Sequence, residues 1–318
     1  MKLHEYKEEF KSLISIVANK LHIPESAVER DYYIVFLLKK LENSEYAEKC
    51  VFKGGTSLSK CYPGSIERFS EDIDLTFLGM NLSDNVCDKN IKRIEAVMTD
   101  GTETKKIPSE RNPRSKSMYV WFENEDNKVK LEIGSSVRPD PYSKKTFKSY
   151  IHEFLEELGE EEDIKKFMLS SVTLNVLDIE RTFIDKIMSV KRHAICGNLD
   201  KKVRHIYDVV RLFKLEKIQT FLSNKEELKR LIQVTKETDS YYLEKREIPN
   251  EYNPKGAYDF NSWKLKFTPQ IRLRYETLHK DLLYTDEQQN FDEVLNTFNE
   301  LNIIFNEIDE WSRLVKWL

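Results

Sequence analysis

The feature that most constrains this chain is a pair of carboxylates in an otherwise apolar strand. Residues 52–79 read FKGGTSLSKCYPGSIERFSEDIDLTFLG. Alternate side chains of a strand share a face, so Asp72 and Asp74 point the same way, about 6–7 Å apart. Two anions this close repel each other unless a cation lies between them, and Mg²⁺ prefers such oxygen ligands. The pattern predicts a magnesium site; the alternative is an exposed pair in salt bridges with Arg68 or a distant lysine.

A glycine pair precedes this strand. It joins the end of one predicted strand to the start of a short predicted helix, in the order Lys53, Gly54, Gly55, Thr56, Ser57. Glycines let the backbone approach a phosphate closely, and a helix N-terminus offers unpaired N–H groups to it. The sequence contains no Walker-type GxxxxGK[ST] loop. A glycine turn followed by paired aspartates therefore indicates a different kind of nucleotide site.

A third acid is available in the predicted strand VKLEIG, residues 129–134. Glu132 and Lys130 take the face opposite the apolar residues of that strand. Three carboxylates can hold two Mg²⁺ ions, which clamp the attacking and leaving oxygens in nucleotidyl transfer. This role requires that the strand lie next to the one with the aspartates. Otherwise Glu132 is a solvated strand residue.

The apolar periodicity predicts an α+β chain, with a mixed domain over residues 1–170 and a helical domain over residues 171–318. The predicted strands are 50–55, 72–79, 117–123 and 129–134, the last two joined by a hairpin turn at 124–127. The predicted helices include 4–20, 25–41, 174–195 and the 287–318 tail, with a loop at 246–261.

Composition narrows the compartment and the partners. No run approaches the ~18 apolar residues that cross a bilayer, and the N-terminus resembles no leader peptide. The four cysteines lie far apart, so neither a disulfide framework nor a zinc site is expected, and the compartment is predicted to be cytoplasmic. The net charge is −4. Two basic clusters nevertheless suit an anionic partner: Lys191, Arg192, Lys201, Lys202 and Arg204; and Lys105, Lys106, Arg111, Arg114 and Lys116.

The segments KGGTSLSKCY and RFSEDIDLTF resemble the first motif of the DNA polymerase β nucleotidyltransferase superfamily. More narrowly, they resemble the AbiEii/MenT toxins of type IV abortive-infection toxin–antitoxin systems. VERDYY (28–33), IERTFIDKI and RHIYDVVRL are similar to other motifs of that family. The resemblance covers residues 25–215 and implies a polymerase β-like mixed sheet with flanking helices, followed by a helical domain that contributes to the site.

The resemblance also implies roles for individual residues. Asp72 and Asp74 would bind the metals, with Glu132 as the third acid and activator of the acceptor hydroxyl. Lys186 would neutralise the pyrophosphate, and Asp208 would orient Lys186. The residues that would bind the nucleotide are Lys53, Gly54, Gly55, Thr56, Ser57 and Ser70.

Two of these roles have plain structural alternatives. Lys186 can equally be an amphipathic lysine that lays its stem over the core. Asp208 can belong to a surface ladder of ion pairs with Arg204 and Arg211. Ser70 suggests regulation, since a phosphate there would place negative charge beside the metals and disfavour nucleotide binding.

The implied activity is transfer of a nucleoside monophosphate from an NTP to the 3′ end of tRNA, with two Mg²⁺ ions. Such transfer would block translation and cause growth arrest or abortive phage infection. The antitoxin would be encoded nearby and act without a stable complex. The alternatives are a nucleotidyltransferase that modifies a small molecule or protein, and a catalytically silent nucleotide-binding regulator.

Overall fold

The computed structural model describes residues 1–243, 252–280, 282–284 and 286–314. Residues 246–251 of the predicted loop lie outside these ranges. The chain forms two compact units: unit 1 comprises Met1–Pro63 and Phe69–Leu177, and unit 2 comprises Gly64–Arg68 and Asp178–Leu318. The last crossing between units therefore follows Leu177, shortly after the boundary that the sequence predicts at residue 170.

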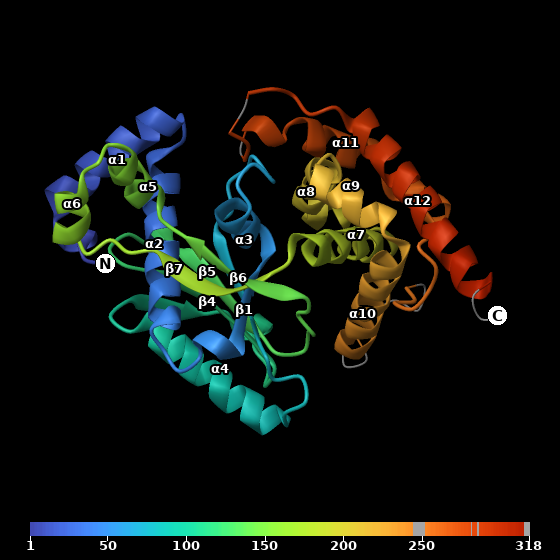
Figure 1. Ribbon diagram of the computed structural model, residues 1–318, viewed down its shortest axis with the longest axis horizontal. Coiled ribbons are helices and arrows are strands. Elements are labelled where there is room, and N and C mark those ends of the chain that lie inside the picture. Colours follow the sequence, from blue (N-terminus) through green and yellow to red (C-terminus); the bar gives the residue numbers. More distant parts are fainter. Residues whose placement is uncertain (244–251, 281, 285, 315–318) are drawn as a thin grey trace. The chain divides into compact units, whose positions relative to one another are not determined.

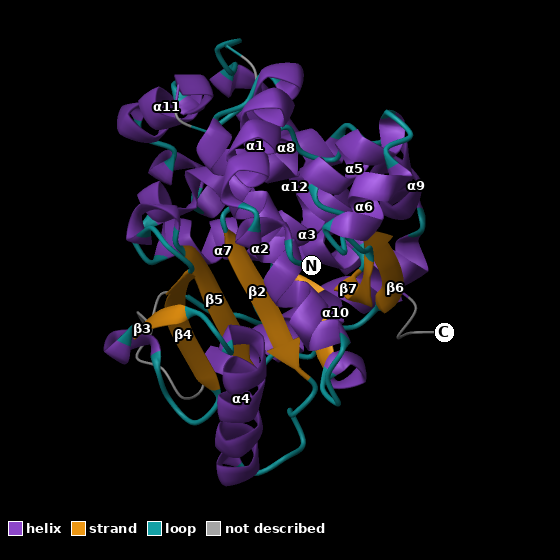
Figure 2. Cartoon of the chain, turned by 90° about the vertical axis from the view of Figure 1, so that its left-hand side faces the viewer, coloured by secondary structure: helices purple, strands orange, loops and turns teal. Residues whose placement is uncertain are grey.

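Unit 1 is built on a seven-stranded mixed sheet with the order β3-β4-β5-β2-β1-β7-β6. Figure 2 shows β2, β5, β4 and β3 side by side. The strands are β1 (Cys50–Lys53), β2 (Asp72–Phe77), β3 (Glu103–Lys106), β4 (Ser115–Trp121), β5 (Val129–Gly134), β6 (Tyr142–Phe147) and β7 (Val172–Leu177).

Strand β2 lies at the centre of this sheet. It pairs antiparallel with β1 and parallel with β5, where Ile73 aligns with Leu131 and Leu75 with Ile133. These four side chains belong to one buried cluster with residues of α2 (Glu25–Glu42) and α4 (Asp84–Thr99). The two helices therefore cover the apolar face of the sheet, and the alternate residues of β2 and β5 emerge on the opposite face.

A second apolar cluster lies among the N-terminal helices of unit 1 (Figure 1). It joins α1 (Lys7–Leu21) and the start of α2 to α5 (Tyr150–Glu157) and to residues that follow α6 (Glu161–Lys166). The predicted helices 4–20 and 25–41 are thus confirmed as α1, with a short 3₁₀ turn before it, and α2. The predicted α+β class is also confirmed.

The sequence prediction is wrong at the start of the 174–195 helix. Residues 172–177 form β7, which pairs with β1 and β6, and α7 (Ile179–Ile195) begins only after it. β7 is buried between two neighbouring strands, so both of its faces are largely apolar and the alternation typical of a half-exposed strand is weak. Strands β3 and β6 and helix α4 were not anticipated either.

Unit 2 is helical, apart from isolated bridging residues. Its helices are α7, α8 (Val203–Phe213), α9 (Glu216–Ser223), α10 (Lys225–Leu243), α11 (Pro269–Glu276) and α12 (Phe291–Leu314). The short segment Gly64–Arg68 also belongs to this unit. Arg68 forms a β-bridge with Leu283, and Glu67 pairs with Arg211 of α8 at 2.8 Å. Among the described residues, no helix is both long and apolar enough to cross a membrane.

A buried ion pair fixes the helix that follows the glycine pair. In α3 (Gly54–Cys61), the Nζ of Lys60 lies 2.8 Å from Oδ1 of Asp31 on α2, and the two side chains are only 3% and 7% exposed. The second carboxylate oxygen of Asp31 accepts the backbone N–H of Tyr150 at 2.7 Å. The ammonium also lies 4.1 Å from the centre of the Tyr150 ring. Burial raises the pKa of Asp31 although Lys60 opposes the shift.

Replacement of Lys60 by methionine should lower the stability of the protein. Lys60→Met leaves the Asp31 carboxylate buried without its cation, and the free energy of unfolding should fall by about 3–5 kcal/mol. The double variant Asp31→Asn/Lys60→Met removes the charge but keeps an acceptor for Tyr150, and it should recover most of that loss. Urea unfolding of the three proteins checks this order. A Lys60→Met protein as stable as the double variant would contradict it.

Candidate active site

The three acids predicted from the sequence lie on one face of the unit 1 sheet. Asp72 and Asp74 occupy alternate positions of β2, and Glu132 lies on β5 in parallel register with Asp74. Adjacent strands are about 4.8 Å apart, so Asp74 and Glu132 start from neighbouring backbone positions. Lys53 of β1 lies in register with Asp74 on its other side. All four residues are half-buried, so the face is polar and still open to solvent.

The glycine pair and the aspartates belong to one structure. A methyl group on Gly54 would lie 2.1 Å from Oδ2 of Asp74, a distance that no side chain tolerates. The same glycine has φ +86°, a conformation that L-residues rarely adopt. Gly54 is therefore required twice, once for the backbone conformation and once for the space that the Asp74 carboxylate occupies. This contact places the start of α3 directly against the acid.

The hydroxyl groups of α3 are used within the fold. The Thr56 hydroxyl contacts the Ser70 hydroxyl at 2.9 Å and the backbone carbonyl of Asp72, and the Ser57 hydroxyl donates to the Gly54 carbonyl at 3.0 Å. Both side chains are buried. A phosphate at this turn would consequently meet backbone N–H groups of the first turn of α3, which have no partners within the helix, rather than these hydroxyls.

Glu132 forms an ion pair within its own strand. The Lys130 ammonium contacts the Glu132 carboxylate and lies 2.8 Å from Oε2 of Glu110. Although burial opposes it, the hydrogen bonds that Lys130 donates to the two carboxylates raise its pKa. Lys130 also lies in register with Asp72, so this cation lies among the acids on the polar face.

Carboxylate oxygens are ligands that Mg²⁺ prefers. The strand register also favours a shared site, because Asp74 and Glu132 lie side by side on neighbouring strands. In the part of the chain that the structure describes, however, no three His, Cys, Asp or Glu side chains converge closely enough to hold an ion as they stand. A metal set of all three acids would therefore require their side chains to reorient, including the Glu132 carboxylate that is paired with Lys130.

Lys186 and Asp208 come together in unit 2. The Nζ of Lys186 on α7 lies 2.7 Å from Oδ2 of Asp208 on α8. Arg68 completes the cluster, with Nε 2.6 Å from Oδ1 and Nη2 2.7 Å from Oδ2 of the same carboxylate. Asp208 is 0% exposed, so the surface ion-pair ladder with Arg204 and Arg211 is wrong. Lys186 is also buried and ion-paired, so it does not extend its ammonium to bulk water.

This cluster carries two cations and one carboxylate. Burial disfavours the charged form of Asp208, but Arg68 and Lys186 outweigh it and hold the pKa of the carboxyl below its usual value. Burial likewise opposes the charge of Arg68, and Asp208 raises its pKa. The Asp208 carboxylate is thus held in its charged form between Arg68 and Lys186.

The residues of these sites lie in a part of the chain that a protein-family model matches. The model of the family described as "Nucleotidyl transferase AbiEii toxin, Type IV TA system" matches residues 36–297, which is most of the chain. The chain belongs to the AbiEii nucleotidyltransferase toxins. This membership brings an NTP substrate and an antitoxin partner with it. No protein among the curated sequences matches at a significant level.

Solved structures with a similar arrangement share little sequence with this AbiEii chain. One is the MenT4 nucleotidyltransferase toxin of Mycobacterium tuberculosis, with 18% identity, a TM-score of 0.48, and 91% of this chain and 98% of that one covered. Another is a protein of H. pylori assigned to the nucleotidyltransferases, with 18% identity, a TM-score of 0.38, and 81% and 98% covered.

The sequence did not predict the ion pairs of two charged residues of this AbiEii chain, Arg68 and Lys130. Arg68 was considered only as a partner for the strand aspartates, whereas it binds Asp208, 140 residues later in the chain. Its position in the RFSEDID segment was the available signal. Lys130 was noted only for its place on the polar face. The alternating VKLEIG pattern puts it two residues from Glu132, and this spacing could have predicted their ion pair.

Most of the second predicted basic cluster is neutralised by acids of α4. Arg111 pairs with Glu95 at 2.7 Å, and Arg114 and Lys116 each lie 2.6 Å from Asp84 and Asp88 respectively. These pairs attach α4 to β4 and to the loop before it. Lys105 and Lys106, on β3, are exposed, and Lys105 lies 3.8 Å from Oε1 of Glu125.

Part of the first basic cluster is also neutralised. Lys191 is buried and donates to the backbone carbonyl of Ala257, and Arg192 pairs with Asp239 at 3.0 Å. Lys201 and Arg204 are exposed and have no ion-pair partner among the described residues. These two side chains are therefore the ones in this cluster that are best placed to meet an anionic partner.

A methyl group at position 54 should disrupt the acid site. Gly54→Ala adds both an unfavourable φ and a clash with the Asp74 carboxylate, so it should lower NTP binding and nucleotidyl transfer at least tenfold. Gly159→Ala is the matched control in unit 1, because Gly159 has φ +74° but open space around its Cα. Fluorescence titration with an NTP analogue and urea unfolding check both variants. Equal effects at the two positions would contradict the clash.

Proposed function

We propose that this AbiEii chain transfers a nucleoside monophosphate from an NTP to the 3′ end of tRNA. The observation that carries the proposal is the register of β2 with β5, which places Asp74 beside Glu132 while Gly54 leaves room for the Asp74 carboxylate. A helix N-terminus and three acids on one face are the parts that nucleotidyl transfer needs.

In the proposed reaction the 3′-hydroxyl oxygen of the acceptor attacks the α-phosphorus of the NTP. A new P–O bond forms, the bond between the α-phosphorus and the bridging oxygen breaks, and pyrophosphate leaves. Asp72, Asp74 and Glu132 would hold two Mg²⁺ ions, which supply charge neutralisation at the reacting phosphates. Glu132 accepts the hydroxyl proton, and the first turn of α3 donates backbone N–H groups to the triphosphate.

The cluster in unit 2 supplies positive charge to the same reaction. Lys186 neutralises the leaving pyrophosphate. Asp208 is a positioning residue that holds Lys186 and Arg68 through both of its oxygens. Only three residues separate Arg68 from Asp72 in the sequence.

The exposed cations favour an RNA acceptor over a small molecule. Lys105 and Lys106 on β3 of unit 1 and Lys201 and Arg204 of unit 2 are exposed, and the phosphates of an RNA chain are suitable counter-ions for such side chains. Modification of the tRNA 3′ end prevents aminoacylation and arrests growth, which suits a toxin that its antitoxin must control without a stable complex. Ser70 contacts Thr56 beside Asp72, so its phosphorylation is proposed to inhibit nucleotide binding.

A transfer assay tests the proposal. The protein is incubated with Mg²⁺, each labelled NTP in turn, and total tRNA, and the label should appear on the RNA. Asp72→Asn should lower the rate at least a thousandfold, because one acid of the metal set is lost. Lys186→Met should lower it at least a hundredfold.

The control variant is Asp88→Asn, which changes an equally charged residue on the other face of the sheet. It should retain near-normal transfer. Label on a small molecule or protein would redirect the acceptor assignment, and label on RNA that persists in Asp72→Asn would contradict the site.

A further inference from the structure

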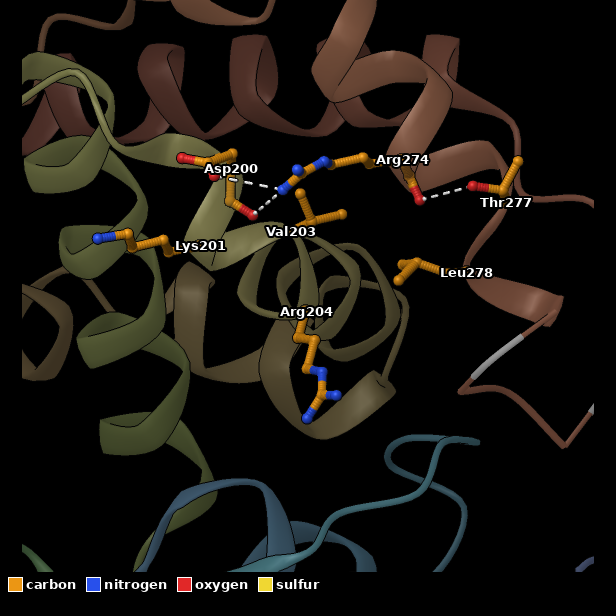
Figure 3. A pocket seen from close by; sticks show the side chains of 7 residues that line it. All are labelled: Asp200, Lys201, Val203, Arg204, Arg274, Thr277 and Leu278. Carbon is orange, nitrogen blue, oxygen red and sulfur yellow. Dashed lines mark hydrogen bonds and ion pairs between the residues drawn. The ribbon is translucent and has the colours of Figure 1, made fainter. Parts of the chain in front are cut away.

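A pocket in unit 2 is lined by Lys201 and Arg204, the two exposed cations of the first basic cluster that have no ion-pair partner among the described residues. It has a volume of about 320 Å³ and lies between the start of α8 and the end of α11 (Figure 3). Its lining residues are Asp200, Lys201, Val203, Arg204, Arg274, Thr277 and Leu278. They include neither Lys186 nor Asp208, so the pocket is distinct from the ion cluster described above.

The pocket carries an excess of positive charge. Arg274 shares its charge with Asp200, since Nη1 lies 3.3 Å from Oδ2 of that carboxylate and 3.4 Å from its backbone carbonyl. Lys201 and Arg204 have no carboxylate partner among the described residues. Three cations therefore face one carboxylate, and all three cationic side chains are exposed. Such a surface attracts anions and retains them when several charges act together.

The directions of the side chains indicate the form of the anion. Figure 3 shows Lys201, at the end of the 3₁₀ turn Leu199–Lys202, and Arg204, at the start of α8, extending in different directions, while Arg274 of α11 reaches toward Asp200. A single phosphate or a compact triphosphate is bound best by donors that converge on it. Separated cations instead suit a chain of phosphates, each of which meets its own side chain.

The wall between these cations is apolar. Val203 and Leu278 face the pocket, and the Thr277 hydroxyl donates to the backbone carbonyl of Leu273 at 2.8 Å. An apolar surface beside these cations can accommodate the sugar or base of a nucleotide while the cations bind its phosphates.

We infer that this pocket anchors the phosphate backbone of the acceptor RNA through Lys201, Arg204 and Arg274. The inference rests on the proposed function for the identity of the strand. It adds a binding site that is separate from the acids of β2 and β5 and from Lys186. The anchor contributes to affinity without taking part in the transfer.

Binding of fluorescent tRNA, measured by anisotropy without NTP or divalent metal, tests the anchor. Lys201→Ala/Arg204→Ala should weaken binding roughly tenfold at low salt and reduce the slope of log K against log salt by about two units, one per cation. Lys264→Ala/Lys266→Ala is the matched control, because it also removes two exposed positive charges from unit 2, outside the pocket. The control should change affinity less than twofold, and thermal unfolding should show that both variants are folded.

The outcomes separate this inference from the proposed function. Equal affinity of the pocket and control variants would overturn the anchor, as would a loss confined to a fluorescent ATP analogue, which would assign the pocket to nucleotide phosphates. Absence of RNA binding by the unmodified chain would overturn it as well. Wild-type protein that binds tRNA through the pocket but transfers no label to it would support the anchor and contradict the transfer proposal.

Discussion

The parallel pairing of β2 with β5 is the constraint on which the rest of the site depends. It aligns Asp74 with Glu132 and Asp72 with Lys130, and the antiparallel pairing with β1 aligns Lys53 with Asp74. Because these positions are set by strand ladders rather than by a loop, the charges are held on a rigid surface. The apolar residues between them are anchored under α2 and α4, so a shift of one residue would bury the acids and expose the core.

Each unit also contains buried charged groups that hold one another. Lys60 and Asp31 attach α3 to α2, while Gly54 lets the start of α3 approach Asp74. In unit 2, Asp208 holds two cations at once. Burial of such groups gains little stability by itself and is costly when one partner is missing. These ion pairs fix the direction of α3, α7 and α8. In the proposed reaction, the first turn of α3 and the Lys186 side chain of α7 bind phosphate groups.

The sequence predicted the parts of this structure that depend on local pattern. The alternation in residues 72–77 and 129–134 was enough to predict two strands and the face on which their acids lie. Which strands are neighbours depends on long-range pairing, so the sequence could state the Asp74–Glu132 proximity only as a condition. β7 was taken for part of a helix because a strand buried on both faces lacks a period of two.

For the charged clusters, too, the sequence predicted what depends on local motifs and not what depends on long-range contacts. Lys186 and Asp208 were selected by motif, and their contact at 2.7 Å follows from the packing of α7 on α8. The partner Arg68 could not be deduced, since it reaches Asp208 from a segment 140 residues away. Conversely, several of the cations predicted to meet RNA are paired within the fold, and three of them, Arg111, Arg114 and Lys116, are paired with acids of α4. Only the tertiary structure distinguishes a paired cation from a free one.

Direct measurement of metal binding tests the central claim most closely. Titration with Mn²⁺, followed by electron paramagnetic resonance in the presence of a non-hydrolysable NTP analogue, counts the ions bound per chain. The account predicts two ions for the unmodified protein, none for Asp72→Asn/Asp74→Asn, and tighter binding for Lys130→Met, in which Glu132 is released from its ion pair. An unchanged number of ions and unchanged affinity in the double aspartate variant would contradict the assignment of these carboxylates.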